Sequence, residues 1–214
     1  MCRDVSGRDY QQRPEAPSGY AQDRERLIAA VAKAVAEHGY AELTVEQVIQ
    51  YAGVSRDIFF LHFETKEEGL VAAQDVFLDR LWLDLVHACE APQAWPLKVR
   101  AGLGAVLTSL AEASSLARVF AVEAAAASLA ATERQFATLE RYASVLREGR
   151  RHYPGTASLP EATERALVGG IASIVSGHLL MEDPQAIPAL EGQLVELVLI
   201  PYLGEAEARR IAAA

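Results

Sequence analysis

The sequence has little of what marks a secreted or membrane protein. Two cysteines, Cys2 and Cys89, among 214 residues exclude a disulfide framework, so we expect free thiols. The longest apolar stretch, residues 166–181, is interrupted by glycine, serine and histidine and falls short of the roughly 18 residues that a membrane span needs. The first residues are polar and charged and contain no apolar segment of a secretory signal. We therefore expect a cytoplasmic protein with no membrane partner.

The chain also lacks net positive charge, since its formal net charge is -9. That balance excludes a broadly basic protein that coats nucleic acid without regard to sequence. Residues 21–66 hold five basic and seven acidic side chains, which gives a local balance of -2. Any DNA affinity must therefore come from a few cations placed at phosphates.

No constellation in the sequence points to a catalytic or metal centre. His87 and Cys89 stand two residues apart, but nothing nearby completes a set of metal ligands, and a buried Cys89 is the simpler interpretation. Ser173, His178 and Asp183 are close in sequence but would lie on different faces of a helix. No glycine-rich phosphate loop follows a strand. We therefore expect no enzyme activity, no metal and no cofactor.

Strand-like alternation is absent too, whereas apolar residues recur with a helical period along most of the chain. The sequence therefore predicts an all-α protein. We interpret residues 1–20 as a flexible arm, 21–66 as a small three-helix domain and 67–214 as a larger helical domain. Helices are expected at residues 23–38, 44–52, 55–63, 66–88, 96–113, 116–129, 132–152, 160–182 and 185–203.

Residues 44–63 carry the signature of a helix-turn-helix motif. Thr44 and Gln47 can form a capping box at the start of one helix. Gly53 can adopt the left-handed conformation that a sharp turn demands, and Ser55 can cap the next, short helix. Two short helices joined by a glycine-containing turn are typical of a DNA-binding unit.

In such a motif the second helix enters the major groove, and its first residues meet the base edges. Here these residues are Ser55, Arg56, Asp57 and Leu61. Arg56 can donate two hydrogen bonds to guanine, and Asp57 can accept one from cytosine or orient Arg56. The alternative for Arg56 and Asp57 is a solvated helix face, with the carboxylate favourably placed near the helix N-terminus.

Lys66 and His62 are candidates for phosphate contacts. Lys66 stands at the expected start of a helix, where its ammonium and the exposed backbone amides could together bind one phosphate. The alternative is an ordinary surface lysine. His62 could touch a phosphate as well, but beside Phe59, Phe60 and Phe63 it is equally suited to packing between helices.

The N-terminal stretch resembles the TetR family of bacterial transcriptional regulators. The resemblance implies a two-fold dimer, a divergent C-terminal domain that binds a small ligand, and release of DNA when the ligand binds. It also implies phosphate contacts by Thr44 and Lys66 and a recognition helix from Ser55 to His62. The matching residues are Leu27 to Ala36, Gly39, Leu43-Thr44-Val45, Ala52-Gly53-Val54-Ser55, Phe59-Phe60-Leu61-His62-Phe63 and Lys66.

Phe60 departs from the family pattern, which usually has tyrosine at this position. Phenylalanine has no hydroxyl with which to hydrogen-bond a phosphate, so that contact is lost. Together with the local charge of -2, this leaves a second hypothesis open. In it the chain is a TetR-like module that binds a ligand or another protein and binds DNA weakly or not at all.

The end of the chain contains a candidate dimer interface. Gly169, Ser173 and Gly177 recur every four residues, and Gly170 lies on the adjoining row, so that another helix can approach closely. The last two helices resemble the dimerisation pair of the family, which implies a four-helix interface from residues 167–180 and 190–203, with Leu194 and Leu197 in it. The alternative is packing within one chain.

Large side chains on the middle helices are candidates for a ligand pocket. Most of them could equally be ordinary core residues, and Glu123 and His178 are added as polar contacts. A hydrophobic or amphipathic effector would suit their aromatic content. The candidates are Phe77, Leu81, Trp82, Val106, Leu110, Phe120, Glu123, Phe136, Tyr142 and His178.

The sequence thus favours a ligand-responsive transcriptional regulator. We expect a repressor that binds an inverted-repeat operator in double-stranded DNA as a homodimer and releases it on binding a small hydrophobic effector.

Overall fold

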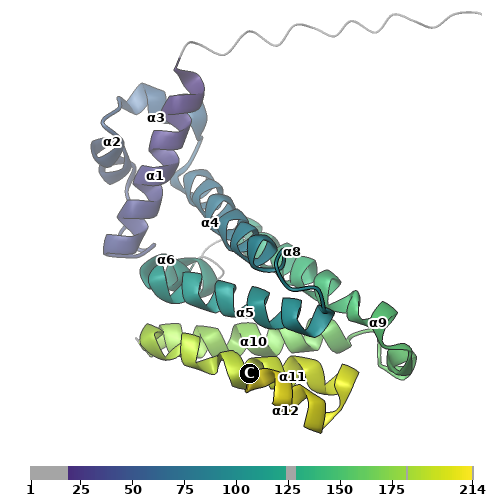
Figure 1. Cartoon of the computed structure of the whole chain (residues 1–214). Helices are drawn as coiled ribbons and strands as arrows, with labels where there is room; N and C mark the ends of the chain where they lie inside the picture. The colour runs from purple at the N-terminus through teal and green to yellow at the C-terminus, as the bar shows by residue number, and fades with distance from the viewer. Residues whose placement is uncertain (1–18, 124–128, 182, 214) are drawn as a thin grey trace, which may run out of the picture.

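The computed structural model describes residues 19–123, 129–181 and 183–213, and all regular elements within them are helices or helical turns. The predicted all-α fold class is confirmed. Figure 1 shows a small group of three helices at one end of the molecule and a larger layered bundle beside it, with α4 leading from one to the other. The expected flexible arm falls on residues 1–18, which lie outside the described residues, and on Gly19 and Tyr20. Tyr20 is already the first residue of α1.

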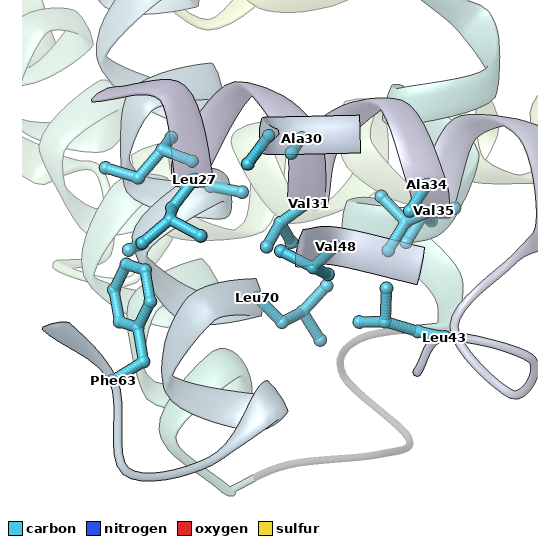
Figure 2. Packing of buried hydrophobic residues seen from close by; sticks show 14 of the residues in the cluster. Leu27, Ala30, Val31, Ala34, Val35, Leu43, Val48, Phe63 and Leu70 are labelled. Atoms are coloured by element: carbon cyan, nitrogen blue, oxygen red, sulfur yellow. The ribbon is translucent and has the colours of Figure 1, made fainter. Parts of the chain in front are cut away.

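The small unit consists of α1 (Tyr20–His38), α2 (Val45–Ala52) and α3 (Arg56–His62). Its core forms because each helix turns one apolar stripe inward. Figure 2 shows side chains from α1, α2 and the start of α4 converging on one another. The fully buried members include Leu27, Val31, Val48, Phe59 and Leu70. Close packing of this kind fixes the angle between α2 and α3.

The larger bundle continues from the small unit without a linker, because α4 begins at Lys66, three residues after Phe63. Its helices pack in layers, with α8 beside α4 and with α10 between α5 and the C-terminal pair (Figure 1). The helices are α4 (Lys66–Ala88), α5 (Trp95–Glu112), α6 (Ser114–Arg118), α8 (Leu129–Arg147), α9 (Gly149–His152), α10 (Thr163–Leu180), α11 (Glu191–Leu203) and α12 (Glu205–Ala212).

The predicted helix over residues 116–129 is wrong in its continuity. The chain instead turns sharply after α5 into the short helix α6, which passes into the π-helix η1 (Val119–Glu123). The axis bends by 99° between α5 and the segment from Ser114 to Ala121. Single turns of π-helix are rare and occur often at functional sites. Here the bend brings Val119 and Phe120 against the core of the small unit.

The last helical segment also differs from the expectation of one helix over 185–203. Two 3-10 turns, η3 (Pro184–Ala186) and η4 (Pro188–Leu190), precede α11, because each proline lacks an amide proton and sets the start of a new turn. After Gly204 at φ 77°, the sequence analysis also missed α12. Acidic residues in its first turn and arginines in its last suit the helix dipole, and this was the available signal.

The stretch Pro184–Leu203 is also long and apolar enough, by length and composition alone, to cross a membrane. Core helices of soluble proteins pass the same test. In this fold Val195, Val198 and Leu199 on α11 are buried against α5 and α12, so its apolar residues are used for packing within the chain.

A buried ion pair holds the end of the bundle that lies far from the small unit. Glu164, on α10, receives two hydrogen bonds from Arg150, at 2.7 and 2.9 Å, and one from the Tyr202 hydroxyl at 2.8 Å. Burial alone would raise the pKa of Glu164, but the hydrogen bonds from Arg150 and Tyr202 outweigh it, and the pKa is lowered. This network ties α9, α10 and α11 together.

Candidate DNA-binding interface and ligand cavity

The caps that define the helix-turn-helix motif are present as the sequence predicts. The Thr44 amide donates to the Gln47 side chain at 2.8 Å, and the Gln47 amide donates to the Thr44 hydroxyl at 3.2 Å. Gly53 has φ 63°, the left-handed conformation that ends α2. The Ser55 hydroxyl accepts from the Ile58 amide at 3.3 Å and so begins α3.

Arg26 is a structural residue of this motif that the sequence analysis missed. Its guanidinium, on α1, donates to the carbonyl oxygens of Ala52 at 2.6 Å and Gly53 at 3.2 Å. A cation at a helix C-terminus compensates both the unpaired carbonyls and the dipole. Arg26 therefore anchors the turn between α2 and α3 to α1, and the signal was a basic residue one turn before the buried stripe of α1.

The outer face of α3 presents polar and apolar groups side by side. Arg56 and Asp57 are exposed, Leu61 is 58% exposed and Phe60 is 45% exposed. Arg56 lies over the Phe60 ring, 5.3 Å from its centre, and pairs with Glu46 of α2. A hydrogen bond from its own backbone amide and the Arg56 guanidinium lower the pKa of Glu46. In this state the Arg56 guanidinium is turned toward α2.

Lys66 and His62 make contacts inside the small unit. The Lys66 ammonium donates to the Leu43 carbonyl at 2.9 Å and lies 5.2 Å from the centre of the Tyr40 ring. The His62 ring packs against Tyr20 at 4.1 Å, and neither of its nitrogens has a hydrogen-bond partner among the described residues. Desolvation lowers the pKa of His62. The geometry of His62 matches the packing alternative, and Lys66 keeps two N–H donors beyond its bond to Leu43.

A cavity of about 560 Å³ lies in the larger bundle, enclosed mainly by α4, α5, α8 and α10. Seven of the predicted ligand residues line it: Phe77, Leu81, Trp82, Val106, Leu110, Phe120 and Tyr142. Phe136 does not, because it lies on the outer side of α8 and is 68% exposed. His178 is likewise outside the lining, although Val175 and Leu179 on the same helix belong to it. The side chain of Glu123 lies outside the described residues.

Three polar atoms in the apolar wall of the cavity have no hydrogen-bond partner among the described residues. They are the side-chain oxygen of Gln74, the indole nitrogen of Trp95 and the hydroxyl of Tyr142. Burial raises the pKa of Tyr142 to about 12, so the hydroxyl keeps its proton at neutral pH. The sequence analysis missed Gln74, whose place among Leu70, Ala73 and Phe77 on the buried stripe of α4 was the signal. Buried polar atoms without partners are rare, and inside a cavity they mark contact points for a ligand.

Two aromatic residues connect the cavity to the small unit. Phe77 and Phe120 both line the cavity, and their rings are 5.3 Å apart. Phe120 is also part of the buried cluster that contains α1, and Phe77 packs against the same cluster. A change in the position of either ring is therefore felt by α1 and α4, which carry the helix-turn-helix motif.

The predicted dimer residues on α10 form an open face. A methyl group added at Gly169, Gly170 or Gly177 would meet nothing within 4 Å, and Ser173 is exposed. Leu197 on α11 is 41% exposed. Leu194 is a correction: at 3% exposure it is buried among residues of its own chain, because it points to the opposite side of α11.

Comparison with known proteins gives the family. The N-terminal family model described as "Bacterial regulatory proteins, tetR family" matches residues 27–73. A helix-turn-helix transcriptional regulator of Mycobacterium tuberculosis is 27% identical over 181 residues, which cover 81% of this chain and 89% of that protein. The regulator EthR of Mycolicibacterium smegmatis is 32% identical over 104 residues, 48% of this chain and 47% of that protein.

Solved structures share the fold. FadR of Bacillus subtilis in complex with stearoyl-CoA superposes with a TM-score of 0.70 over 84% of this chain and 98% of that chain, at 19% identity. RolR in complex with resorcinol superposes with a TM-score of 0.65 over 92% of this chain and 95% of that chain, at 16% identity. The molecule is thus a helix-turn-helix transcriptional regulator with a ligand-binding helical domain. It belongs to the TetR family.

Proposed function

We propose that this regulator is a repressor that binds an inverted-repeat operator as a homodimer and leaves it when a hydrophobic effector enters the cavity. The observation that carries the proposal is the position of Phe77 and Phe120, which belong at once to the wall of the cavity and to the packing of the DNA-binding unit. We place the DNA-binding domain at residues 21–66 and the ligand and dimer domain at 67–214, and the protein would act in the cytoplasm.

For DNA, the proposed contacts follow from the exposed face of α3 and the residues that flank it. Arg56, once released from Glu46, would donate to guanine, and Asp57 would accept from cytosine or hold Arg56. Phe60 and Leu61 would pack against thymine methyl groups or sugars. The Thr44 hydroxyl, Ser55 and the Lys66 ammonium would contact the backbone. His62 has a positioning role against Tyr20 rather than a phosphate contact.

For assembly, the open face of α10 supports a two-fold dimer with α11. The small residues Gly169, Gly170, Ser173 and Gly177 allow close approach of a second copy, and Leu197 supplies an apolar contact. Dimerisation would set the spacing of the two recognition helices, so that the operator mirrors the symmetry of the protein. Sedimentation at micromolar concentration tests this step. A dimer is expected, and a monomer would refute it.

For release, the coupling would run through α4, which forms one wall of the cavity and begins at the end of the helix-turn-helix motif. A ligand that moves Phe77 or Phe120 would shift α4 against α1. In a dimer, such a shift would change the distance between the recognition helices and thereby lower operator affinity. The ligand-bound relatives FadR and RolR support a cavity that accepts different small molecules.

The experiment that tests the proposal is selection from sheared genomic DNA at low and moderate salt. A short inverted repeat is expected to be enriched at both salt concentrations. The second hypothesis, a ligand-binding or protein-interaction module without DNA binding, is favoured by the ion pair between Arg56 and Glu46 and by the exposed Phe60. If no sequence is enriched even at low salt, this second hypothesis holds.

A further inference from the structure

The shape of the cavity limits what it can hold. Its lining on α4 runs from Gln74 to Glu90, and at the helical rise this stripe is about 24 Å long. The linings on α5 and α10, from Trp95 to Leu110 and from Val168 to Leu179, follow the same direction through the bundle (Figure 1). A volume of about 560 Å³ spread over that length gives a mean cross-section on the order of 20 Å². This geometry favours one extended chain over a compact ring system.

One region of the cavity offers two hydrogen-bond donors without partners among the described residues. Trp95 and Tyr142 belong to the same packed cluster, where Trp95 is buried and Tyr142 lies against it. An indole N–H only donates, and a tyrosine hydroxyl that keeps its proton donates readily. Two convergent donors in an apolar wall are suited to a carbonyl oxygen.

The distal end of the cavity holds an acceptor. Gln74 is fully buried; its amide nitrogen donates to the Ala131 carbonyl at 3.4 Å, whereas its oxygen has no partner among the described residues. A hydroxyl group at the far end of a bound chain would satisfy this oxygen. Without such a group, the desolvated oxygen weakens binding of a purely hydrocarbon tip.

The charged residues in the lining lie at the opposite end from Gln74. Glu90 and Glu148 are exposed there and mark the opening, and Lys98 supplies the single positive charge among the lining residues. Two carboxylates outnumber one ammonium, so the opening repels a carboxylate or phosphate headgroup. The ligand that fits these charges is uncharged where it meets the opening.

We propose that the effector is an uncharged, unbranched long-chain ester or ketone, with its carbonyl at Trp95 and Tyr142 and with a hydroxyl group near its far end at Gln74. This inference rests on the proposed ligand-controlled function and names the chemical class of the ligand. It is narrower than a general hydrophobic effector, and it excludes fatty acids and their phosphate-bearing thioesters as preferred ligands.

The chain provides its own reporter, because both of its tryptophans, Trp82 and Trp95, line the cavity. Tryptophan fluorescence is titrated with methyl hexadecanoate, methyl octanoate, hexadecanoic acid, the terminally hydroxylated methyl hexadecanoate and the ring probe pyrene. At neutral pH, methyl hexadecanoate is expected to bind at least about tenfold more tightly than the acid and than the short ester, and the hydroxylated ester more tightly still. An acid that binds as tightly as the ester, or pyrene that binds more tightly than every chain, overturns the proposal.

Two variants assign the polar contacts. Tyr142→Phe is expected to weaken ester binding about three- to tenfold and to leave binding of the hydrocarbon heptadecane unchanged. Its matched control is Tyr51→Phe, which removes a hydroxyl that pairs with Glu37 far from the cavity and is expected to change neither. Gln74→Met is expected to abolish the preference for the hydroxylated chain. Equal effects of Tyr142→Phe and Tyr51→Phe would contradict the carbonyl contact.

The outcomes also separate this inference from the proposed function. If pyrene binds and releases operator DNA, the repressor stands and the long-chain ligand is wrong. If methyl hexadecanoate binds as expected but the protein selects no DNA, the ligand class stands and the repressor is wrong.

Discussion

The two regions of this molecule treat buried space in opposite ways. The helix-turn-helix unit fills its interior with apolar side chains such as Leu27, Val48 and Phe59, and its helix ends at Thr44 and Ser55 are capped. The larger bundle leaves a cavity of about 560 Å³ and keeps polar atoms in its wall without partners. The difference teaches that the first region is built for a fixed shape, whereas the second gives up packing energy that a ligand can restore.

The largest expected effect comes from breaking the dense core. Phe59→Ala is expected to lower the free energy of unfolding by about 3–5 kcal/mol, because the fully buried ring leaves a cavity that its neighbours cannot fill. Urea denaturation followed by circular dichroism measures it. The control is Phe60→Ala on the same helix, where the half-exposed ring should cost much less. Similar losses for both would contradict the description of a dense core.

A second test concerns the rigid end of the larger bundle. The pKa of Glu164 is lowered in the folded state, so its stabilising contribution is present above the ordinary value of 4.5 and is lost as the pH falls through the lowered value. Glu164→Gln is expected to cost about 3 kcal/mol at neutral pH, because Arg150 loses its partner, and to flatten the acid side of the stability curve.

The control for that measurement is Glu140→Gln. Glu140 is an exposed carboxylate whose pKa is also lowered, through hydrogen bonds from Arg147 and Arg165, but solvent screens it. Its removal should change stability little at any pH. An acid profile of Glu164→Gln that matches the wild type would show that the buried pair does not determine the pH dependence.

The DNA-binding face should separate into two kinds of contact. Arg56→Ala is expected to cost about 1–3 kcal/mol of operator affinity at one base position, whereas Lys66→Ala should weaken binding to all sequences alike and reduce the salt slope by about 1. Fluorescence anisotropy with cognate and random duplexes at several salt concentrations measures both. Identical behaviour of the two variants on both duplexes would contradict the assigned roles.

The smallest effect sharpens the comparison, since the same substitution should have opposite signs in the two regions. Val106→Phe, in the cavity wall, is expected to raise the free energy of unfolding by about 1 kcal/mol because it fills empty space. Val48→Phe, in the dense core, should instead lower it by about 1–3 kcal/mol through overpacking. Thermal unfolding of both variants measures this, and the same sign at both sites would break the comparison.

The sequence could predict the helix-turn-helix unit because its determinants are local. Thr44 with Gln47, Gly53 and Ser55 act over three or four residues, and each adopts the predicted conformation. Arg26 escaped prediction because its partners, Ala52 and Gly53, are distant in sequence. The bend that splits the expected helix at residues 116–129 depends in the same way on packing of Phe120 against α1.

The cavity could be predicted only in part, for a related physical reason. Large apolar residues on amphipathic helices face inward whether they line a cavity or fill a core, so Phe77 and Tyr142 were found together with Phe136, which faces outward. Gln74 was missed because a single glutamine on an apolar stripe gains meaning only when its oxygen is seen to lack a partner. Leu194 was misassigned because α11 is apolar on several faces, and its sequence does not distinguish the inner face from the outer.

The central claim is that occupancy of the cavity controls DNA binding. The direct measurement follows operator anisotropy and tryptophan fluorescence in one titration with methyl hexadecanoate, using the wild type and the cavity-filled variant Val106→Phe. The account predicts that wild-type protein leaves the operator over the same concentration range in which the fluorescence changes, and that the filled variant stays bound. A wild-type protein whose fluorescence shows a filled cavity while its operator affinity is unchanged would contradict the account.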